Sequence, residues 1–587
     1  MLLTVALTAF VVAGAAAAKS TITPAPPFTP GQEQLSAGDD WITAAGGLND
    51  NRHSTLTQIN PSNIGGLKLA WTGTFGLPKA AAAVPEEGAA LAYKGTLFMP
   101  DGLNAVQAID GVTGKAIWNY SPVNDTAALL PANRGLALGD GEVYIGQNDG
   151  NVVALDQQTG NVIWKTKVGD PTDGIQFTSA PVYYNGMVIE GASGGDWGGR
   201  SFAIALDARS GQELWRWYVA PSPGSLGSGS WGINEWQRGG GAIWIYPSID
   251  VSQGLLYLVT GNPIPWNGRG PGNNLWSDSI VALHLQSGQF AWGFQTVHHD
   301  IWDYDVTNPP VLFDLTYNGN LTPAVGVASK TGWVYLLNRY TGKSILGIPE
   351  KKVPQLKGAA AKYANVSKTQ PYPVGEPFTS QCSTRKQWPG KAPDGKPYIV
   401  GCIFTPYAYV KGQATFLASA PSAEGGVDWQ PSGYDPATHF QYLCSIDGAG
   451  TAIGAIPNAE KTIVPGALSL GVNFGAPSPN TPDTPQIVAM DMLTNTVAWK
   501  VTQPPSTNKK VPSARCSGIL STPGIVFAGQ ENTSQLGAYD PATGKNLWLS
   551  SKLATAPGGP PITYTGADGK QYVVVLGNTG LIYGFSL

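Results

Sequence analysis

The sequence predicts an all-β protein built from repeated small sheets, and three observations support this. A turn motif recurs along most of the chain, Gly and Pro occur throughout, and Trp is frequent. The 75 Gly and 47 Pro residues follow no collagen-like period, which favours many short strands joined by tight turns. The 19 Trp residues supply large flat side chains that can pack between neighbouring sheets.

The repeated unit is a short apolar strand, then Ala-x-Asp-x-x-Thr/Ser-Gly, then Trp four residues after the Gly. Asp and Thr bond the turn backbone, Gly accepts a positive φ, and the next strand runs back antiparallel. The complete copies end at Trp118, Trp164, Trp215 and Trp548. The altered copies have His284 in the Asp position before Trp292, Asn495 in the Gly position before Trp499, and Leu346 in the Trp position.

The ends of the chain supply one further copy, split in two. Gly580–Leu587 is a strand with no turn after it, and Asn63–Trp71 is the missing last strand with its Trp. Joining the two closes a ring and removes two exposed sheet edges. Spacings of roughly 46 to 54 residues suit four-stranded blades with loop insertions. The sequence therefore predicts an eight-bladed β-propeller with Trp-docking repeats, closed by its N- and C-terminal strands.

Residues 19–587 are expected to form this one domain, with an insertion at about 349–422. Tyr434–Thr438 looks like a ninth turn, but we interpret it as the inner hairpin of the blade that ends at Trp499. Ile249–Gly254 precedes a strand in the same way. The insertion contains Cys382 and Cys402, and their pairing is favoured among the three connectivities that four Cys residues allow.

The first 18 residues are predicted to be a signal peptide, because an apolar run ends there in four Ala residues. Export agrees with the four Cys residues, since disulfides form in oxidising compartments. A periplasmic or secreted protein is expected, with no stable membrane span in the mature chain. The net charge of -4, without a basic run, gives no indication of nucleic-acid binding.

The segment QTVHHDIWDYDVTNPP, at 295–310, concentrates rare polar groups. Only 13% of the chain is charged, yet this segment holds Asp300, Asp303 and Asp305 beside two His residues. If 303–305 is extended, Asp303 and Asp305 share one face, because strand side chains alternate. Two carboxylates on one face repel unless a cation or a proton lies between them. The alternative is a solvated loop with an Asx turn before the two prolines.

Four local motifs then point to one family: GASGGD at 191–196, GGG at 239–241 with Trp244, GNPIPWN at 261–267 and HDIWD at 299–303. Together with the Trp repeats, they make the chain resemble the quinoprotein alcohol dehydrogenases, periplasmic enzymes that use pyrroloquinoline quinone (PQQ) and a metal ion. The resemblance covers nearly the whole mature chain. It implies oxidation of an alcohol to an aldehyde or ketone by hydride transfer to PQQ. Electrons would then pass to a separate acceptor, such as a soluble cytochrome c.

The resemblance places the metal ligands on Asp196, Asn262 and Asp303, all oxygen donors, as a hard cation needs. It also places the catalytic base on Asp303, which would take the hydroxyl proton. Family members that use a lanthanide have a second Asp two residues later, and here that position is Asp305. We therefore expect Asp305 to be a ligand and the site to prefer a lanthanide over calcium.

The resemblance also implies how an anionic tricarboxylate quinone is held. Two cations fall on Arg134 and Lys330, and Trp244 falls where an indole stacks on the quinone. The remaining positions carried over are Glu87, Thr178, Ser193, Gly194, Gly195, Asp428 and Trp429. Each of three residues also has a purely structural interpretation. Arg134 could form a strand-end ion pair, Lys330 could be a turn residue, and Trp244 could be a core residue.

Three positions depart from the family pattern. The adjacent Cys pair of the best-known members is replaced by residues 127–130, Ala-Ala-Leu-Leu, so one quinone face would meet apolar side chains. Asp196 stands where Glu is usual, and is one methylene shorter. Asp428 stands where Asn is usual, and adds negative charge near an anionic cofactor.

A non-catalytic propeller, acting as a scaffold or binding protein, would explain the repeats equally well. It would not explain why Asn262, Asp303 and Trp244 occur together in enzyme-like motifs. The sequence leaves the substrate open between a small alcohol and polyvinyl alcohol or another polyol. It also leaves open whether the chain forms a homodimer.

Overall fold

A computed structural model describes residues 22–75, 86–122, 129–267, 269–410, 413–448, 450–461, 463–477, 483–505 and 514–587. The predicted signal peptide, 1–18, lies outside these ranges, as do Ala127 and Ala128 of the predicted quinone face. No helix within the described ranges is long and apolar enough to cross a membrane.

Antiparallel sheets of one design follow each other along the described residues. The first sheet consists of β2 Leu91–Tyr93, β3 Thr96–Pro100, β4 Val106–Asp110 and β5 Ala116–Tyr120, and the second of β6 Ala137–Gly139, β7 Glu142–Gly146, β8 Asn151–Asp156 and β9 Val162–Lys167. The third sheet consists of β10 Val182–Tyr184, β11 Met187–Gly191, β12 Phe202–Asp207 and β13 Glu213–Tyr218. The fourth consists of β14 Ser248–Asp250, β15 Leu255–Val259, β16 Ser279–His284 and β17 Phe290–Gln295. The next three are β18 Val311–Tyr317, β19 Asn320–Ala328 and β20 Val334–Asn338; β27 Gly433–Asp435, β28 Phe440–Asp447, β31 Thr484–Asp491 and β32 Thr496–Thr502; and β33 Cys516–Thr522, β34 Ile525–Gln530, β35 Gln535–Tyr539 and β36 Asn546–Leu549. Strand order in each of these sheets follows the chain, so each is an up-and-down meander.

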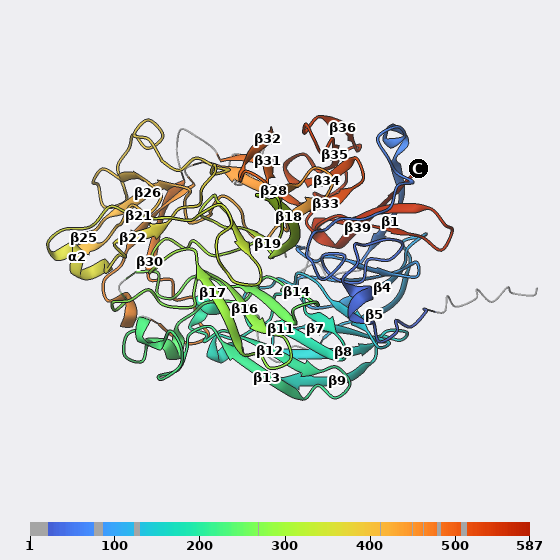
Figure 1. Cartoon of the computed structure of the whole chain (residues 1–587), viewed down its shortest axis with the longest axis horizontal. Helices are drawn as coiled ribbons and strands as arrows, with labels where there is room; N and C mark the ends of the chain where they lie inside the picture. Colours follow the sequence, from blue (N-terminus) through green and yellow to red (C-terminus); the bar gives the residue numbers. More distant parts are fainter. Residues whose placement is uncertain are drawn as a thin grey trace, which may run out of the picture.

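The last sheet joins the two ends of the described chain, as predicted. Its strands are β37 Ile562–Thr565, β38 Gln571–Leu576, β39 Leu581–Ser586 and, from the start of the chain, β1 Lys68–Thr74. β1 pairs antiparallel with β39, and Figure 1 shows the blue strand beside the red one. With this sheet, the described residues hold eight meanders, which agrees with the predicted propeller.

The repeated Trp residues bind each blade to the next. The indole N–H of Trp118 donates to the Gln157 carbonyl at 3.0 Å, and that of Trp164 donates to the Ala208 carbonyl at 2.8 Å. The turn Gly lies under the ring of the preceding Trp: a Cβ at Gly160 would be 2.5 Å from the Trp118 ring. Gly is therefore required there by close approach as well as by its positive φ of 73°.

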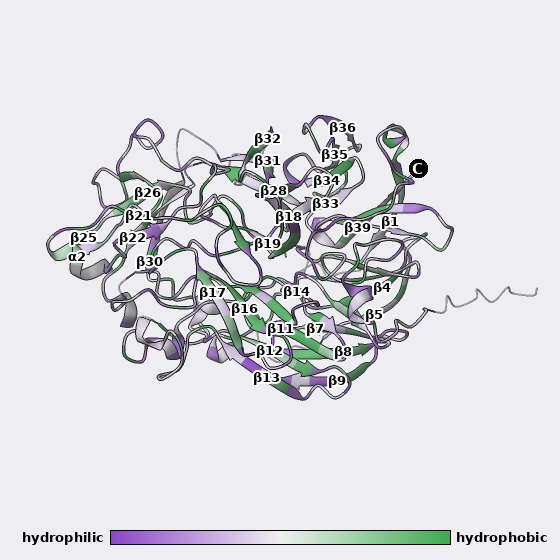
Figure 2. Cartoon of the chain, in the orientation of Figure 1, coloured by the Kyte–Doolittle hydropathy of each residue, from purple (hydrophilic) through white to green (hydrophobic). Residues whose placement is uncertain are grey.

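Burial decreases from the inner to the outer strand of a blade. Every residue of β11 is buried, whereas β13 and β9 carry mostly exposed or half-buried residues. In Figure 2, β7, β8, β11 and β12 are largely green, whereas β1 and β13 carry purple segments. The apolar core therefore lies between the blades, and the outermost strands face water.

Two predicted details of the repeat are confirmed. β27 pairs with β28 in the blade of Trp499, so Tyr434–Thr438 belongs to an inner hairpin of that blade, as β14 and β15 do in theirs. Asn495, in the Gly position, has a φ of 53°. The copy with Leu346 in place of Trp belongs to the three-stranded sheet β18–β20, which ends shortly before the insertion begins.

The 349–422 segment adds further structure outside the blades. It holds β21 Glu350–Lys352, α2 Ala359–Ala364, β22 Thr369–Pro371, β23 Ile399–Cys402, β24 Tyr409–Val410, β25 Gln413–Ala414 and β26 Phe416–Ala420. β23 and β26 form a sheet with β29 Thr451–Ala455 and β30 Val472–Pro477, which come from between β28 and β31. The segment between β28 and β31, which carries β29 and β30, is a second excursion from the blades that the sequence did not predict. These elements gather on the left of Figure 1. The remaining α-helix, α1, spans Pro30–Glu33 near the start of the described chain.

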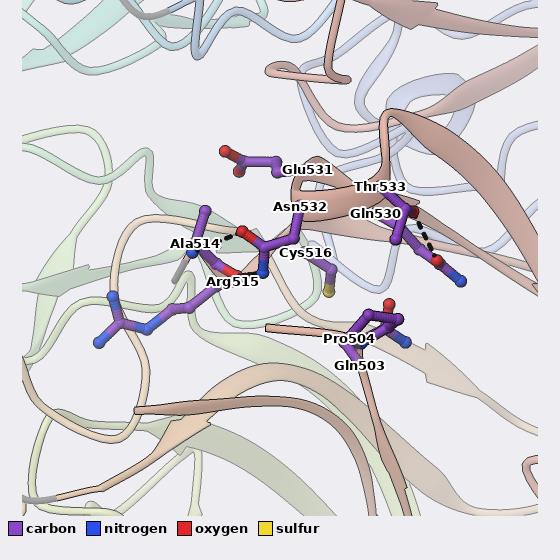
Figure 3. Close-up of a pocket in the computed structure, with 9 residues that line it drawn as sticks. All are labelled: Gln503, Pro504, Ala514, Arg515, Cys516, Gln530, Glu531, Asn532 and Thr533. Atoms are coloured by element: carbon purple, nitrogen blue, oxygen red, sulfur yellow. Dashed lines mark hydrogen bonds between the residues drawn. The ribbon is translucent and has the colours of Figure 1, made fainter. Parts of the chain in front are cut away.

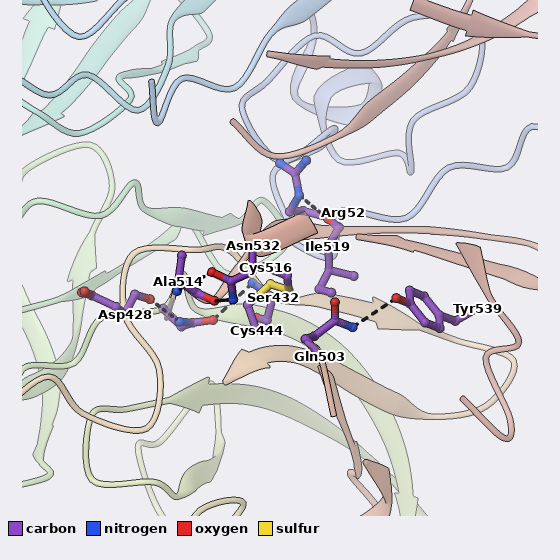
Figure 4. Close-up of a disulfide and its surroundings, with 11 residues drawn as sticks. Arg52, Asp428, Ser432, Cys444, Gln503, Ala514, Cys516, Ile519, Asn532 and Tyr539 are labelled. Carbon is purple, nitrogen blue, oxygen red and sulfur yellow. Dashed lines mark hydrogen bonds between the residues drawn. A yellow bond between two sulfur atoms is a disulfide. The ribbon is translucent and has the colours of Figure 1, made fainter. Parts of the chain in front are cut away.

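Both disulfides join segments distant in sequence. Cys382 pairs with Cys402, as favoured from the sequence, and Cys444 pairs with Cys516. Cys516 lies in a surface depression where Asn532 exchanges two hydrogen bonds of 3.1 Å with the backbone of Ala514 (Figure 3). The bridge itself ties β28 of one blade to β33 of the next (Figure 4).

Removing the Cys444–Cys516 bridge is expected to destabilise the ring. It spans 72 residues, and closing a loop of that length removes enough freedom from the unfolded chain to be worth about 4 kcal/mol. We expect the Cys444→Ser/Cys516→Ser variant to lose about this much unfolding free energy in guanidinium titrations. The Cys382→Ser/Cys402→Ser variant, with a separation of 20, should lose about 3 kcal/mol. Equal stability of wild type and the first variant would contradict the expectation.

Candidate active site

One cavity collects most of the predicted site residues. It has a volume of about 190 Å³. Its lining contains Arg134, Thr178, Ser193, Gly194, Gly195, Asp196, Trp244, Asn262, Asp303, Asp305 and Lys330. These residues come from loops that follow or precede different blades, so the fold brings distant parts of the sequence together. Glu87, Asp428 and Trp429 do not line the cavity.

The loop that carries Asp303 is not extended, so the alternation of strand side chains does not apply at 303–305. Asp303 has a φ of 70° and lies outside any strand. The cause is Asp300, whose two carboxylate oxygens accept the backbone N–H groups of Trp302 at 2.8 Å and Tyr304 at 2.7 Å. Asp303 and Asp305 nevertheless line the same cavity. Asp300 is therefore a structural partner in the turn.

Residues of the insertion support this loop from behind. The indole N–H of Trp302 donates to the Thr405 carbonyl at 2.8 Å, and the hydroxyl of Tyr304 donates to the Pro421 carbonyl at 2.7 Å. Trp302 and Tyr304 are buried, and both rings lie edge-on to Phe404. The insertion therefore helps to fix the position of Asp303.

The sequence indicates no role for His298. In the structure, this residue connects the same loop to β21 and β22. Its ring nitrogens lie 2.8 Å from Gln295 Oε1 and 3.0 Å from Glu350 Oε1. Its backbone exchanges two hydrogen bonds of 2.7 Å with the Gln370 side chain. His299 Nδ1 lies 2.6 Å from the Gly272 carbonyl oxygen, which agrees with an orienting residue.

Three of the four oxygen donors proposed for a metal, Asp196, Asn262 and Asp305, lie in one hydrogen-bonded group. The Asn262 amide donates to Asp196 at 3.0 Å, and the Asn262 backbone N–H donates to Asp305 at 2.8 Å. The other Asp305 oxygen accepts the indole N–H of Trp244 at 3.0 Å. Asp196 also accepts the indole N–H of Trp266 at 3.3 Å.

Two buried cations lie in the same cavity. Arg134 pairs with Glu87 at 2.6 Å, donates to the Thr178 hydroxyl at 3.0 Å and lies 4.7 Å from the Trp244 ring centroid. Lys330 pairs with Asp303 at 2.8 Å. Burial alone would lower the pKa of Lys330, but nearby carboxylates, first Asp303, hold that pKa well above its usual value.

Asp428 is neutralised by a residue that the sequence did not indicate. Its carboxylate lies 3.8 Å from the Arg515 guanidinium, which also donates to the Gly425 carbonyl at 2.8 Å. This ion pair offsets the negative charge that distinguishes Asp428 from the usual Asn. Trp429 is half-buried and packs against the apolar cluster that Trp244 also contacts.

The cavity has four further lining residues: Leu130, Gln176, Trp197 and Ala242. Leu130 belongs to the segment that departs from the family, but the other three were missed. Trp197 directly follows the motif at 191–196, and Ala242 directly follows the motif at 239–241. Their position next to these motifs could have indicated that they line the cavity. Gln176, two residues before Thr178, had no chemical signal of its own.

The residues present fit an anionic quinone and a hard cation. Arg134 and Lys330 supply buried positive charge, and Trp244 supplies a flat ring in the same cavity. Burial, and then repulsion from Asp305, raises the pKa of Asp196. A cation beside these carboxylates would relieve that cost. In the described ranges no group of three His, Cys, Asp or Glu side chains forms a metal cluster, and the proposed set includes the Asn262 amide.

Comparison with known proteins decides the family. The model of "PQQ: Glucose/ethanol/alcohol dehydrogenase, beta-propeller domain" matches residues 41–462 and 471–573. The chain belongs to the family of PQQ-dependent alcohol dehydrogenases. The dehydrogenase subunit of the quinone alcohol dehydrogenase from Komagataeibacter europaeus is 30% identical to the enzyme, over 93% of this chain and 72% of that protein.

Two further relatives bear on the metal and the fold. The lanthanide-dependent methanol dehydrogenase of Methylacidiphilum fumariolicum (strain SolV) is 29% identical, over 93% of the enzyme and 86% of that protein. The quinohemoprotein alcohol dehydrogenase ADHIIG of Pseudomonas putida HK5 superposes with a TM-score of 0.75 at 25% identity. That match covers 94% of the enzyme and 80% of that chain.

Proposed function

We propose that the enzyme oxidises an alcohol to an aldehyde or ketone in this cavity, with PQQ and one metal ion, and passes the electrons to a separate acceptor such as a soluble cytochrome c. The observation that carries the proposal is the convergence of Asp196, Asn262, Asp303, Arg134 and Lys330 on one cavity. A non-catalytic scaffold has no need of buried charges gathered in a cavity.

Asp303 is the proposed base. When bound, PQQ supplies a carbon that accepts hydride, and the metal ion polarises that carbon as a Lewis acid. Asp303 takes the proton of the substrate hydroxyl at its carboxylate as the hydride leaves the substrate carbon. Lys330, at 2.8 Å, orients this carboxylate.

The other residues hold the two bound groups. Arg134 and Lys330 offer charge to the quinone carboxylates, with Thr178, Ser193, Gly194 and Gly195 as hydrogen-bonding neighbours and Trp244 as the stacking ring. Glu87 orients Arg134 through their ion pair. Asp428 and Trp429 are proposed to act at the edge of the same site.

Asp196, Asn262 and Asp303 are the proposed metal ligands, and Asp305 is the proposed fourth. Both Asp305 oxygens accept one protein donor each, and a carboxylate oxygen retains a second lone pair for a cation. An additional carboxylate favours a trivalent ion. The lanthanide dependence of the methanol dehydrogenase from Methylacidiphilum fumariolicum agrees with this preference.

Reconstitution tests both the proposed alcohol oxidation and the proposed preference for a lanthanide. The protein would be mixed with PQQ and either calcium or lanthanum, and its quinone absorbance and dye reduction followed with a panel of small and polymeric alcohols. We expect bound quinone and turnover, at least about fivefold faster with lanthanum, since one more unit of charge near a carboxylate is worth about 1 kcal/mol or more. Equal activity with calcium would refute the lanthanide preference. Absence of bound quinone and turnover with either ion would refute the function and favour a scaffold.

The cellular setting follows from the same proposal. Residues 1–18 are proposed to direct export, so that oxidation takes place in the periplasm or outside the cell. The enzyme is proposed to act either alone or as a homodimer.

A further inference from the structure

A buried carboxamide holds one wall of the cavity. Gln176 is only 1% exposed, and its side chain makes three hydrogen bonds to one short segment. Its Oε1 accepts the N–H groups of Leu129 at 2.9 Å and Leu130 at 3.2 Å. Its Nε2 donates to the Leu130 carbonyl at 3.1 Å. One side chain thus satisfies three backbone groups of two adjacent residues.

The backbone of Gln176 is fixed to a second wall of the same cavity. Its carbonyl accepts the Ser193 N–H at 2.9 Å and the Ser193 hydroxyl at 3.0 Å. Two residues later, the Thr178 hydroxyl accepts from Arg134 and donates to Ser193. Gln176 therefore connects the 129–130 segment to the residues proposed to hold the quinone.

Apolar packing provides little of the attachment of this segment. Neither Leu129 nor Leu130 belongs to an apolar core cluster within the described residues, and Leu130 is 43% exposed while lining the cavity. Leu129 lies over Gly194, where an added Cβ would be 3.5 Å from its Cδ1. The segment is therefore held in place mainly through the Gln176 side chain.

We propose that Gln176 is a positioning residue that fixes the backbone of Leu129 and Leu130 and so holds Leu130 as an apolar wall of the cofactor cavity. This rests on the proposed function, since it assigns the wall to the quinone. Gln176 needs no contact with substrate to act, because it works through the two leucines. When the carboxamide is lost, three backbone groups lose their partner and the wall is released toward solvent.

Two measurements on Gln176→Met test the proposal. Met keeps the length and apolar volume of the side chain but removes its donor and its acceptor. We expect hydrogen exchange at the Leu129 and Leu130 amides of the cofactor-free protein to accelerate at least about tenfold, because their acceptor is lost. We also expect PQQ to dissociate at least about tenfold faster from the reconstituted variant.

The control is Gln571→Met. Gln571 is also buried, accepting the Ile59 N–H at 2.8 Å and donating to Thr563 at 3.0 Å, but it lies in the closing sheet. Its loss should change neither measurement. Gln176→Asn, which keeps a carboxamide one methylene shorter, provides a milder variant in case Gln176→Met does not fold.

Unchanged exchange at both leucine amides in the folded Gln176 variants would overturn the proposal. Faster exchange with unchanged PQQ dissociation would overturn the positioning role, because the wall would then move without consequence for the cofactor. Failure of the wild-type protein to bind PQQ would instead refute the proposed function. Hydrogen exchange is measured without PQQ, so it still shows whether Gln176 holds the 129–130 segment.

Discussion

Replacing Asp303 with Asn is expected to reduce turnover by about 10² to 10⁴-fold while the protein stays folded, because an amide cannot take the hydroxyl proton. The substitution keeps the size of the side chain and its place at φ 70°. It also removes the partner of the buried Lys330 ammonium. The measurement is dye-linked alcohol oxidation, with the far-ultraviolet circular dichroism spectrum as the test of folding.

Asp207→Asn is the matched control. Asp207 bonds the turn between β12 and β13 and takes no part in the cavity, so its turnover should equal that of wild type. Because Asp303 is also a proposed ligand, bound metal and PQQ must be measured in each variant. Wild-type turnover in Asp303→Asn would show that the base is another residue.

Replacing Arg52 with Met is expected to have the largest effect on stability among single substitutions outside the site. Arg52 is fully buried and donates to three carbonyls from separate segments: Ala44 at 2.5 Å, Ile519 at 2.6 Å and Pro561 at 2.6 Å. These bonds connect the N-terminal segment to β33 and to the segment before β37. Three buried carbonyls without a donor should together cost about 4 kcal/mol of unfolding free energy.

Arg209→Met provides the comparison, since its side chain is 80% exposed and pairs with Asp140 at 3.2 Å. Its loss should leave the unfolding free energy close to that of wild type. Denaturant titration of the two variants measures both values. An effect of Arg52→Met as small as that of Arg209→Met would contradict the connecting role.

The sequence predicted the blades well because their signals are local. An Asp, a Thr and a Gly within one turn define each hairpin, and the Trp that follows must dock where the next turn leaves room. The closing sheet was also predictable, because β1 and β39 each lacked a partner strand. The second excursion, with β29 and β30, was missed because it has no repeat and lies between two strands of one blade.

The site was predictable only where a motif recurs in a family. Asp303 and Asn262 belong to such motifs, and the cavity gathers them as expected. The backbone at Asp303 was not predictable, because its positive φ follows from Asp300 accepting two N–H groups. Gln176 and Arg515 were missed because each acts on residues more than 40 positions away, and no local pattern marks such contacts.

The most direct test of the account is the position of a lanthanide ion in crystals grown with PQQ and lanthanum, found by anomalous scattering. We expect one strong peak in this cavity, within about 2.6 Å of oxygens of Asp196, Asn262 and Asp303. A peak absent from the cavity, or bound only by surface carboxylates, would contradict it.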